Sequence, residues 1–136
     1  MYAHTLVPIA LDHENEVDRM FEIARRLGSE GGKITVLHVM EAIPGYVAAQ
    51  MPEGLLEEAR AATARRIEDI AGKAGGSAHW AVVGGSPGNA IVEYADEHGV
   101  DCIVLASHQP GVTDYFLGST AARVVRHASC SVHVIR

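Results

Sequence analysis

The sequence predicts an α/β protein with one parallel sheet of five strands in the order 3-2-1-4-5 and helices on both faces. Short apolar, β-branched runs alternate with longer segments of helical periodicity along the whole chain. A strand, a helix and a second strand in succession imply a right-handed crossover, which makes the strands parallel and lets helices cover both faces. The 136 residues suit one domain over 1–136 with a single core of ordinary size.

The first half of the chain shows this alternation twice. Strands are recognised by apolar and β-branched runs, and helices by apolar side chains three and four positions apart. Glycines at 28–32 and at 75–76 end the two helices. The expected elements are a strand over 5–9, a helix after Asp12 up to Leu27, a strand over 33–39, a loop over 43–52 and a helix over 53–73.

The second half continues the pattern. Ser86 is suited to cap a helix and Pro87 to occupy its first position. The expected elements are a strand over 78–83, a helix from Pro87 that closes at Gly99, a strand over 101–106, a helix over 118–128 and a strand over 131–135. In the last helix we expect four apolar side chains to face inward, namely Ala121, Val124, Val125 and Ala128.

Composition narrows the range of partners and locations. The net charge is −6 and the eleven Lys and Arg residues are scattered, which argues against a nucleic-acid partner. No run approaches the roughly 18 apolar residues of a membrane span, and the start of the chain lacks a secretory signal, so we expect no membrane partner and a cytoplasmic location. Cys102 and Cys130 adjoin apolar strands without metal or disulfide spacing, so both are expected to be reduced packing residues.

The loop over 107–117 is the first candidate site. In parallel α/β sheets, ligands bind beyond the carboxyl ends of the strands where the strand order reverses, here between the first and fourth strands. This loop and residues 10–14 meet there, and it is longer than a usual connection of about 2–6 residues. Gly118, Ser119 and Thr120 open the last helix, so their N–H groups and the helix dipole form a seat for phosphate. Capping without a ligand explains the same Gly-Ser pair equally well.

Side chains suited to catalysis or metal binding are few. Ser107 and His108 are adjacent, so they point apart at a strand end, and ligand contact or loop packing is the favoured role of His108. Asp12 either caps the first helix, which is favoured, or helps to hold Mg²⁺ that is bound mainly by phosphates. The histidines lack helical metal-site spacing, and His38 and His133 are interpreted as core or surface imidazoles within strands.

Five motifs are distributed over essentially the full length of the chain. They are Thr5-Leu-Val-Pro-Ile9, Leu37-His-Val39, Val83-Gly-Gly-Ser-Pro87, Asp101-Cys-Ile-Val-Leu-Ala-Ser-His108, and Leu117-Gly-Ser119 with Arg126-His-Ala-Ser-Cys-Ser-Val-His-Val-Ile135. Together they resemble the universal stress protein family. The resemblance implies the family's Rossmann-like sheet, similar to that of the adenine nucleotide α-hydrolases. Nucleotide-binding members hold ATP, usually with Mg²⁺, at the loops after strands one and four. The implied ligand is therefore ATP, with Mg²⁺ bound through its phosphates.

The long loop departs from the family's phosphate-binding pattern, which is Gly, two residues, Gly, nine residues, Gly and then Ser or Thr. Ala106 and Gln109 stand at the first two glycine positions, and only eight residues separate Gln109 from Gly118. The Ser-His-Gln-Pro sequence looks like that of a bacterial subgroup in which a polar residue and proline replace the second glycine and ATP binding is kept. A second departure is Ala10, where many relatives carry Asp.

The resemblance also implies individual nucleotide contacts. Val39 would offer backbone groups to adenine, residues 8–10 would flank the base, and the long loop with the helix start would contact the phosphates. The full set is Pro8, Ile9, Ala10, Val39, Ala106, Ser107, His108, Gln109, Gly118, Ser119 and Thr120. No Walker lysine and no assured catalytic base are found, so no catalytic residue is assigned and hydrolysis is expected to be slow at most.

Two functional classes follow. The favoured one is a cytoplasmic stress-response protein that binds ATP and works as a nucleotide-dependent regulatory or chaperone-like module. The alternative is a nucleotide-free interaction protein of the same fold. An ATP pyrophosphatase-type enzyme is disfavoured, because its Ser-Gly-Gly-x-Asp-Ser loop would follow the first strand, where Ala10-Leu-Asp-His13 stands. The edge strand 131–135 favours pairing with a second chain, and the resemblance implies a homodimer through it, with a tetramer left open.

Overall fold

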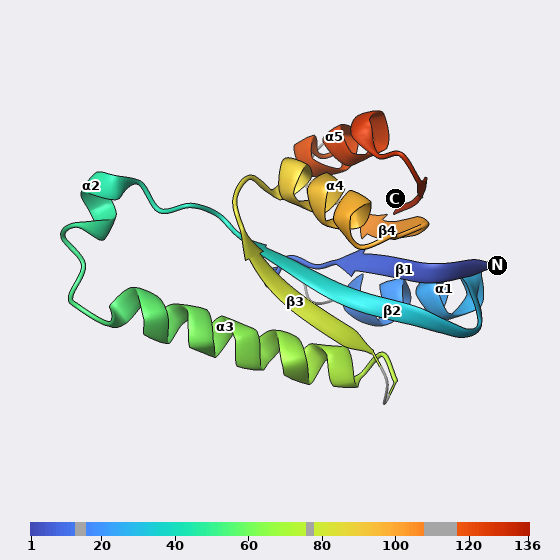
Figure 1. Ribbon diagram of the computed structural model, residues 1–136, viewed down its shortest axis with the longest axis horizontal. Helices are drawn as coiled ribbons and strands as arrows, with labels where there is room; N and C mark the ends of the chain where they lie inside the picture. The colour runs from blue at the N-terminus through green and yellow to red at the C-terminus, as the bar shows by residue number, and fades with distance from the viewer. Residues whose placement is uncertain (13–15, 76–77, 108–116) are drawn as a thin grey trace.

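The computed structural model describes residues 1–12, 16–75, 78–107 and 117–136. It contains a parallel sheet of five strands in the order β3-β2-β1-β4-β5 (Figure 1), which confirms the predicted fold class. The strands are β1 (Tyr2–Pro8), β2 (Gly28–Met40), β3 (His79–Gly84), β4 (Cys102–Ala106) and β5 (Ser131–Ile135). The helices are α1 (Val17–Leu27), α2 (Gly45–Ala48), α3 (Leu55–Gly72), α4 (Pro87–Glu97) and α5 (Ser119–His127).

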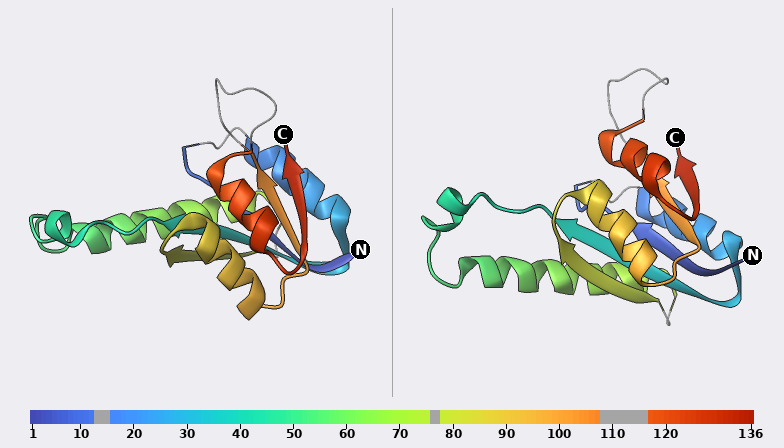
Figure 2. Two further views of the ribbon diagram at one scale, coloured as in Figure 1. Left: turned by 90° about the horizontal axis from the view of Figure 1, so that it is seen from above. Right: turned by 45° about the horizontal axis from the view of Figure 1, so that its top comes forward.

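Helices cover both faces of the sheet and create two cores. α1 and α3 pack on one face, and α4 and α5 pack on the other (Figures 1 and 2). Along β1, Val7 belongs to the core with Phe21 of α1, whereas Leu6 belongs to the core with Ile91 of α4. This alternation follows from the two-residue period of a strand, and it makes β1 the central layer between the two cores.

Several local features differ from the sequence prediction. β2 begins at Gly28, so the stretch 28–32, expected to precede the strand, is part of it. The expected loop over 43–52 contains the short helix α2. Val125 is 46% exposed, because α5 buries only the narrow face that carries Ala121 and Val124. Ser86 holds the N-cap position of α4 as predicted, but its side chain forms no capping hydrogen bond.

A polar cluster joins the amino-terminal half of β1 to the middle of β2, to the C-cap of α4 and to the residue that precedes β4. The His4 ring, 8% exposed as a residue, places Nε2 2.8 Å from the Thr35 hydroxyl and Nδ1 3.1 Å from the His98 carbonyl. A carbonyl only accepts, so Nδ1 carries the proton and Nε2 of the neutral ring accepts from Thr35. The N–H groups of Ala3 and His4 both donate to the Asp101 carboxylate at 2.9 Å. Four segments are therefore held together by hydrogen bonds at this end of the sheet.

Both cysteines are free thiols, as predicted. Burial raises the pKa of the Cys102 thiol to about 11, so it stays protonated at neutral pH and acts as an apolar packing residue. Within the described ranges, no helix combines the length and the apolar character that a bilayer crossing requires.

Candidate functional site

A cavity of about 650 Å³ opens at the carboxyl ends of β1, β2 and β4. β1 and β4 are neighbours in the sheet, but the helices that follow them, α1 and α5, lie on opposite faces. The cavity therefore lies at the point where the winding order reverses, as the sequence predicted. Its volume falls within the range of about 300–1,000 Å³ that is typical of small-molecule sites.

The floor of the cavity is apolar. Ile9, Leu37, Ile91 and Leu105 line it, and each is at most 6% exposed. Ile9 belongs to the core under α1, whereas the other three belong to the core under α4 and α5. The cavity therefore lies where the two cores meet, and its floor suits an uncharged ring better than a charged group.

Val39 lines the wall just beyond the end of β1. The pairing of β1 with β2 runs as far as Pro8 opposite Leu37, and one further bond joins the Ile9 N–H to the Leu37 carbonyl at 2.8 Å. In a strand, the backbone N–H and C=O groups of every second residue point to the same side. The N–H and C=O of Val39 therefore point to the same side of β2 as those of Leu37, which is the side of β1, but β1 has already ended at this level. This strand edge can therefore offer an N–H donor and a C=O acceptor to a ligand.

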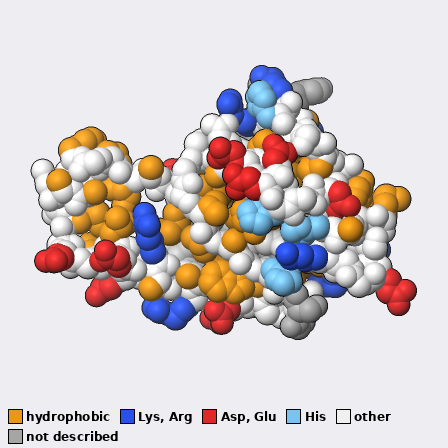
Figure 3. All heavy atoms as spheres, viewed as in Figure 1, with side chains coloured by type: hydrophobic (Ala, Val, Ile, Leu, Met, Phe, Trp, Pro, Cys, Tyr) orange, Lys and Arg blue, Asp and Glu red, His pale blue; other side chains and the backbone are white. Residues whose placement is uncertain are grey.

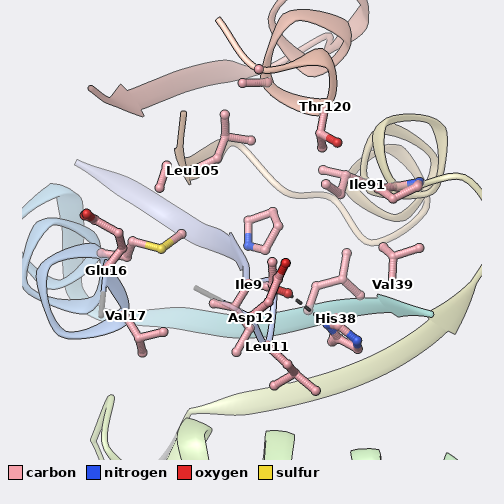
Figure 4. Close-up of a pocket in the computed structure, with 18 of the residues that line it drawn as sticks. Ile9, Leu11, Asp12, Glu16, Val17, His38, Val39, Ile91, Leu105 and Thr120 are labelled. Carbon is pink, nitrogen blue, oxygen red and sulfur yellow. Dashed lines mark hydrogen bonds between the residues drawn. The ribbon is translucent and has the colours of Figure 1, made fainter. Parts of the chain in front are cut away.

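His38 also lines the cavity, although the sequence pattern indicated only a core or surface imidazole. Its Nδ1 lies 2.9 Å from the Ile9 carbonyl, as the dashed line in Figure 4 shows. Because the carbonyl accepts, Nδ1 carries a proton, and Nε2 of the neutral ring is an acceptor. The sequence feature that could have identified His38 as a cavity residue is its position near the carboxyl end of β2, the strand that pairs with β1.

The start of α5 forms the opposite side of the cavity. Gly118 holds the N-cap position, and the first helical hydrogen bond runs from the Ala122 N–H to the Gly118 carbonyl at 2.8 Å. The N–H groups of Ser119, Thr120 and Ala121 therefore have no carbonyl partner within the helix, and they carry the positive end of its dipole. Figure 4 shows Thr120 pointing from α5 toward the cavity. This side of the cavity is suited to an anion.

Ser107 lies behind this helix start, outside the lining of the cavity. Its Oγ accepts the Gly118 N–H at 3.1 Å, and its own N–H donates to the Ile135 carbonyl at 2.8 Å. The Gly118 N–H, one of the donors considered for phosphate, therefore already has an acceptor in the protein. The donors that remain are those of the next residues along α5.

The charged side chains of the described cavity wall are acidic. They are Asp12, Glu16 and Glu41. Lys and Arg are absent from the described lining, and residues 13–15 and 108–116 contain none in the sequence. No group of three His, Cys, Asp or Glu side chains among the described residues could hold a metal ion. A cation in this cavity would therefore depend on the phosphates of a ligand for much of its coordination.

Eight of the predicted contact residues line the cavity, namely Pro8, Ile9, Ala10, Val39, Ala106, Gly118, Ser119 and Thr120. His108 and Gln109 lie outside the described residues. Asp12 lines the cavity as well, but the favoured capping role is wrong, because α1 begins at Val17 with Glu16 in the N-cap position. Next to Asp12, the Leu11 carbonyl accepts a hydrogen bond from Arg66 of α3 at 3.4 Å.

The sequence matches the universal stress protein family over residues 1–136. The chain belongs to this family. This universal stress protein is 28% identical over 143 residues to Universal stress protein A homolog 2 of Coxiella burnetii. That match covers 99% of this chain and 95% of the relative.

Solved structures share the fold of this universal stress protein. The hypothetical protein PH0823 matches with a TM-score of 0.77 and 25% identity, over 99% of this chain and 96% of that one. A universal stress protein in complex with cAMP matches with a TM-score of 0.68 and 21% identity, over 99% and 97% of the two chains. The Archaeoglobus fulgidus protein in complex with dAMP matches with a TM-score of 0.63 and 23% identity, over 99% and 98%.

Proposed function

We propose that this protein binds an adenine nucleotide, ATP with Mg²⁺, in the cavity at the carboxyl ends of β1, β2 and β4. The observation that carries the proposal is that one cavity joins an apolar floor, the strand edge at Val39 and the start of α5 at Ser119. Adenine is a flat ring with donors and acceptors on its edge, and phosphate is an anion, so the two sides of the cavity match the two ends of the ligand. The complexes of two relatives with cAMP and dAMP support the adenine nucleotide class.

In this proposal the base lies against residues 8–10 and Val39, and the phosphates lie at Ser119 and Thr120. Ala106, His108, Gln109 and Gly118 complete the phosphate end, and Ser107 supports it through the hydrogen bond to the Gly118 N–H. We propose further that the chain belongs to the nucleotide-binding subgroup in which Gln109 and the following proline replace the second glycine of the loop.

Mg²⁺ fits this arrangement through the phosphates of the ligand. Asp12 and Glu16 offer carboxylate oxygens at the cavity wall, which are ligands that Mg²⁺ accepts, but they do not form a complete site by themselves. Bound Mg²⁺ would offset the negative charge of a triphosphate beside these carboxylates. No Lys or Arg of the described lining can do so, and we therefore expect ATP to bind more tightly with Mg²⁺ than without it.

The proposed role is that of a cytoplasmic regulatory module, a single domain over 1–136, that responds to its bound nucleotide. Slow hydrolysis at most is expected, since the described lining offers no cation to stabilise charge that develops on the γ-phosphate. We also propose a homodimer through β5. This strand pairs with β4 and forms an edge of the sheet, so its outer backbone groups can pair with a second chain.

Isothermal titration of the purified protein with ATP tests the proposal, first with Mg²⁺ and then with a chelator. We expect saturable heat with Mg²⁺ and a weaker complex with the chelator. No heat and no thermal shift at millimolar nucleotide would contradict nucleotide binding itself. Equal affinity under the two conditions would contradict only the role of Mg²⁺.

Gly118→Asp locates the binding site. The φ angle of −59° at Gly118 suits any residue, and an aspartate at an N-cap accepts the helix N–H groups that phosphate would use. We expect binding of ATP to be lost while the helix stays intact. The matched control is Gly45→Asp, which adds the same charge at the start of α2, where a new Cβ meets nothing within 4 Å. Unchanged affinity in Gly118→Asp would move the phosphates elsewhere.

The alternative function, a nucleotide-free interaction protein, is favoured by a different region. Apolar side chains lie exposed on the arm formed by α2 and the start of α3 (Figure 3). Tyr46 is 74% exposed, and Leu55 is 42% exposed. Apolar surface of this kind often marks a contact with another protein. This function gains support if the titration shows no heat and removal of the Tyr46 side chain abolishes association with a partner protein.

A further inference from the structure

We propose that Ser107 is a positioning residue, which fixes the start of α5 so that the N–H groups of Ser119 and Thr120 face the phosphate. This inference rests on the proposed nucleotide site. Ser107 itself lies outside the lining of the cavity. It acts through the hydrogen bond that its Oγ accepts from the Gly118 N–H at 3.1 Å.

Ser107 ties together three elements that meet behind the phosphate end of the cavity. It directly follows β4, and its backbone N–H donates to the carbonyl of Ile135, the last residue of β5, at 2.8 Å. Its hydroxyl holds Gly118, which is eleven residues further along the chain and directly precedes α5. The edge of the sheet is thereby connected to the helix start by two hydrogen bonds from one residue.

The Ser107 hydroxyl supplies the hydrogen-bond acceptor for the buried backbone N–H of Gly118. Gly118 is buried, and its N–H precedes the first helical hydrogen bond of α5, so it has no carbonyl partner within that helix. A buried N–H without an acceptor is unfavourable, and removal of the Ser107 hydroxyl would let the helix start shift to find another partner. Such a shift would misalign the donors of Ser119 and Thr120 with a phosphate.

The opposite side of the cavity does not depend on this bond. Val39 and Ile9 belong to the ends of β2 and β1, which are fixed by their own pairing up to Pro8 opposite Leu37. Loss of the hydroxyl is therefore expected to weaken the binding of the phosphates and to spare the binding of the base. A residue with only a general structural role would affect both parts of the ligand equally.

The test compares ATP with Mg²⁺ and adenosine as ligands in isothermal titration of wild type and Ser107→Ala. We expect ATP to bind about three- to tenfold more weakly to the variant, the usual effect of one lost hydrogen bond, and adenosine to bind with unchanged affinity. Ser107→Thr keeps the hydroxyl and is expected to restore ATP binding. The matched control is Ser129→Ala, which removes an exposed hydroxyl that donates to Asp96 at 2.7 Å, away from the cavity.

Three results would overturn the inference, which are equal losses for ATP and adenosine, no loss for ATP, and no restoration by Ser107→Thr. If Ser107→Ala does not fold, Ser107→Cys replaces it, since a thiol is a weak acceptor of similar shape and the same preferential loss for ATP is expected. Faster amide exchange at Gly118 in these variants is a second expected result that needs no ligand.

A wild type that binds neither ligand would refute the proposed function, and this inference with it. A wild type that binds both, without the selective loss, would refute the inference alone.

Discussion

The two ends of the central strands differ in how their polar groups are satisfied. In the amino-terminal half of β1, the His4 ring bonds to the Thr35 hydroxyl and to the His98 carbonyl, and the Asp101 carboxylate accepts from backbone N–H groups of β1, so these polar groups have partners within the protein. At the carboxyl ends, the backbone of Val39 and the first N–H groups of α5 point to a cavity of about 650 Å³. Polar groups at the first end therefore stabilise the fold, whereas those at the second are available to a ligand.

The difference has a cause in the topology. In a parallel sheet, each strand leads into a helix from its carboxyl end, so unpaired N–H groups of helix starts gather there. Helix ends and the returning chain gather at the opposite end, where the His98 carbonyl at the C-cap of α4 accepts from His4. A change at the amino end should thus alter the free energy of unfolding and leave ligand affinity unchanged.

His4→Leu is expected to give the largest effect on stability. It leaves the buried Thr35 hydroxyl without its partner and removes the part-buried hydrogen bond to the His98 carbonyl. Two such losses predict a decrease of about 2–4 kcal/mol in the free energy of unfolding. Urea denaturation at pH 7 measures it, with the exposed His79→Leu as a control expected to change little. A change in nucleotide affinity of comparable size would contradict the conclusion that polar groups at this end of the sheet affect stability and not ligand binding.

Acid is expected to weaken the same cluster. Burial lowers the pKa of His4 in the folded protein, and Lys33 of β2 and His79 of β3 lower it further, against the His98 carbonyl and Asp101, which raise it. The unfolded chain then binds a proton more readily, so stability is complete above pH 6.5 and falls as the pH drops below that value. The slope for one such group is at most about 1.4 kcal/mol per pH unit.

The comparison of wild type with His4→Leu isolates this contribution from all other titrating groups. The stability difference between the two proteins is expected to narrow from pH 7 to pH 5. Urea denaturation at several pH values measures it. A difference that stays constant over this range would show that the His4 proton does not contribute.

The sequence predicted the cavity end of the sheet better than the opposite end. Ser119 and Thr120, which line the cavity, could be proposed from the sequence because a long loop and a Gly-Ser helix start are local patterns. His4 was not assigned to a strand, since its polar side chain interrupts an apolar run, and β1 begins at Tyr2 and not at residue 5. What allows a buried histidine there is the Thr35 hydroxyl and the His98 carbonyl, which are 31 and 94 residues away in the sequence. No local pattern contains such partners.

The lining of the cavity shows the same limit of prediction from local sequence patterns. His38 and Ile91 line it, but neither was assigned to the site from the sequence. Each lies on a strand or helix whose pattern is fully explained by packing, so only the sheet order brings them beside the end of β1. Residues on the loops after β1 and β4 could be predicted, because the strand order already implies that those loops meet.

Two buried threonines provide the smallest and most selective test of the comparison. Thr35 donates its hydroxyl to His4, whereas the Thr5 hydroxyl, 0% exposed, has no hydrogen-bond partner among the described residues. Thr5→Val removes an unsatisfied polar atom and keeps the shape of the side chain nearly constant. We expect the free energy of unfolding to increase by about 0.5–1.5 kcal/mol. Thr35→Val removes a satisfied partner, and we expect a loss of similar size, since Nε2 of His4 then lacks a donor. Urea denaturation of both variants decides the point: a gain in stability for Thr35→Val would mean that its hydrogen bond does not stabilise the fold, and a loss for Thr5→Val would mean that burial of its unsatisfied hydroxyl carries no penalty.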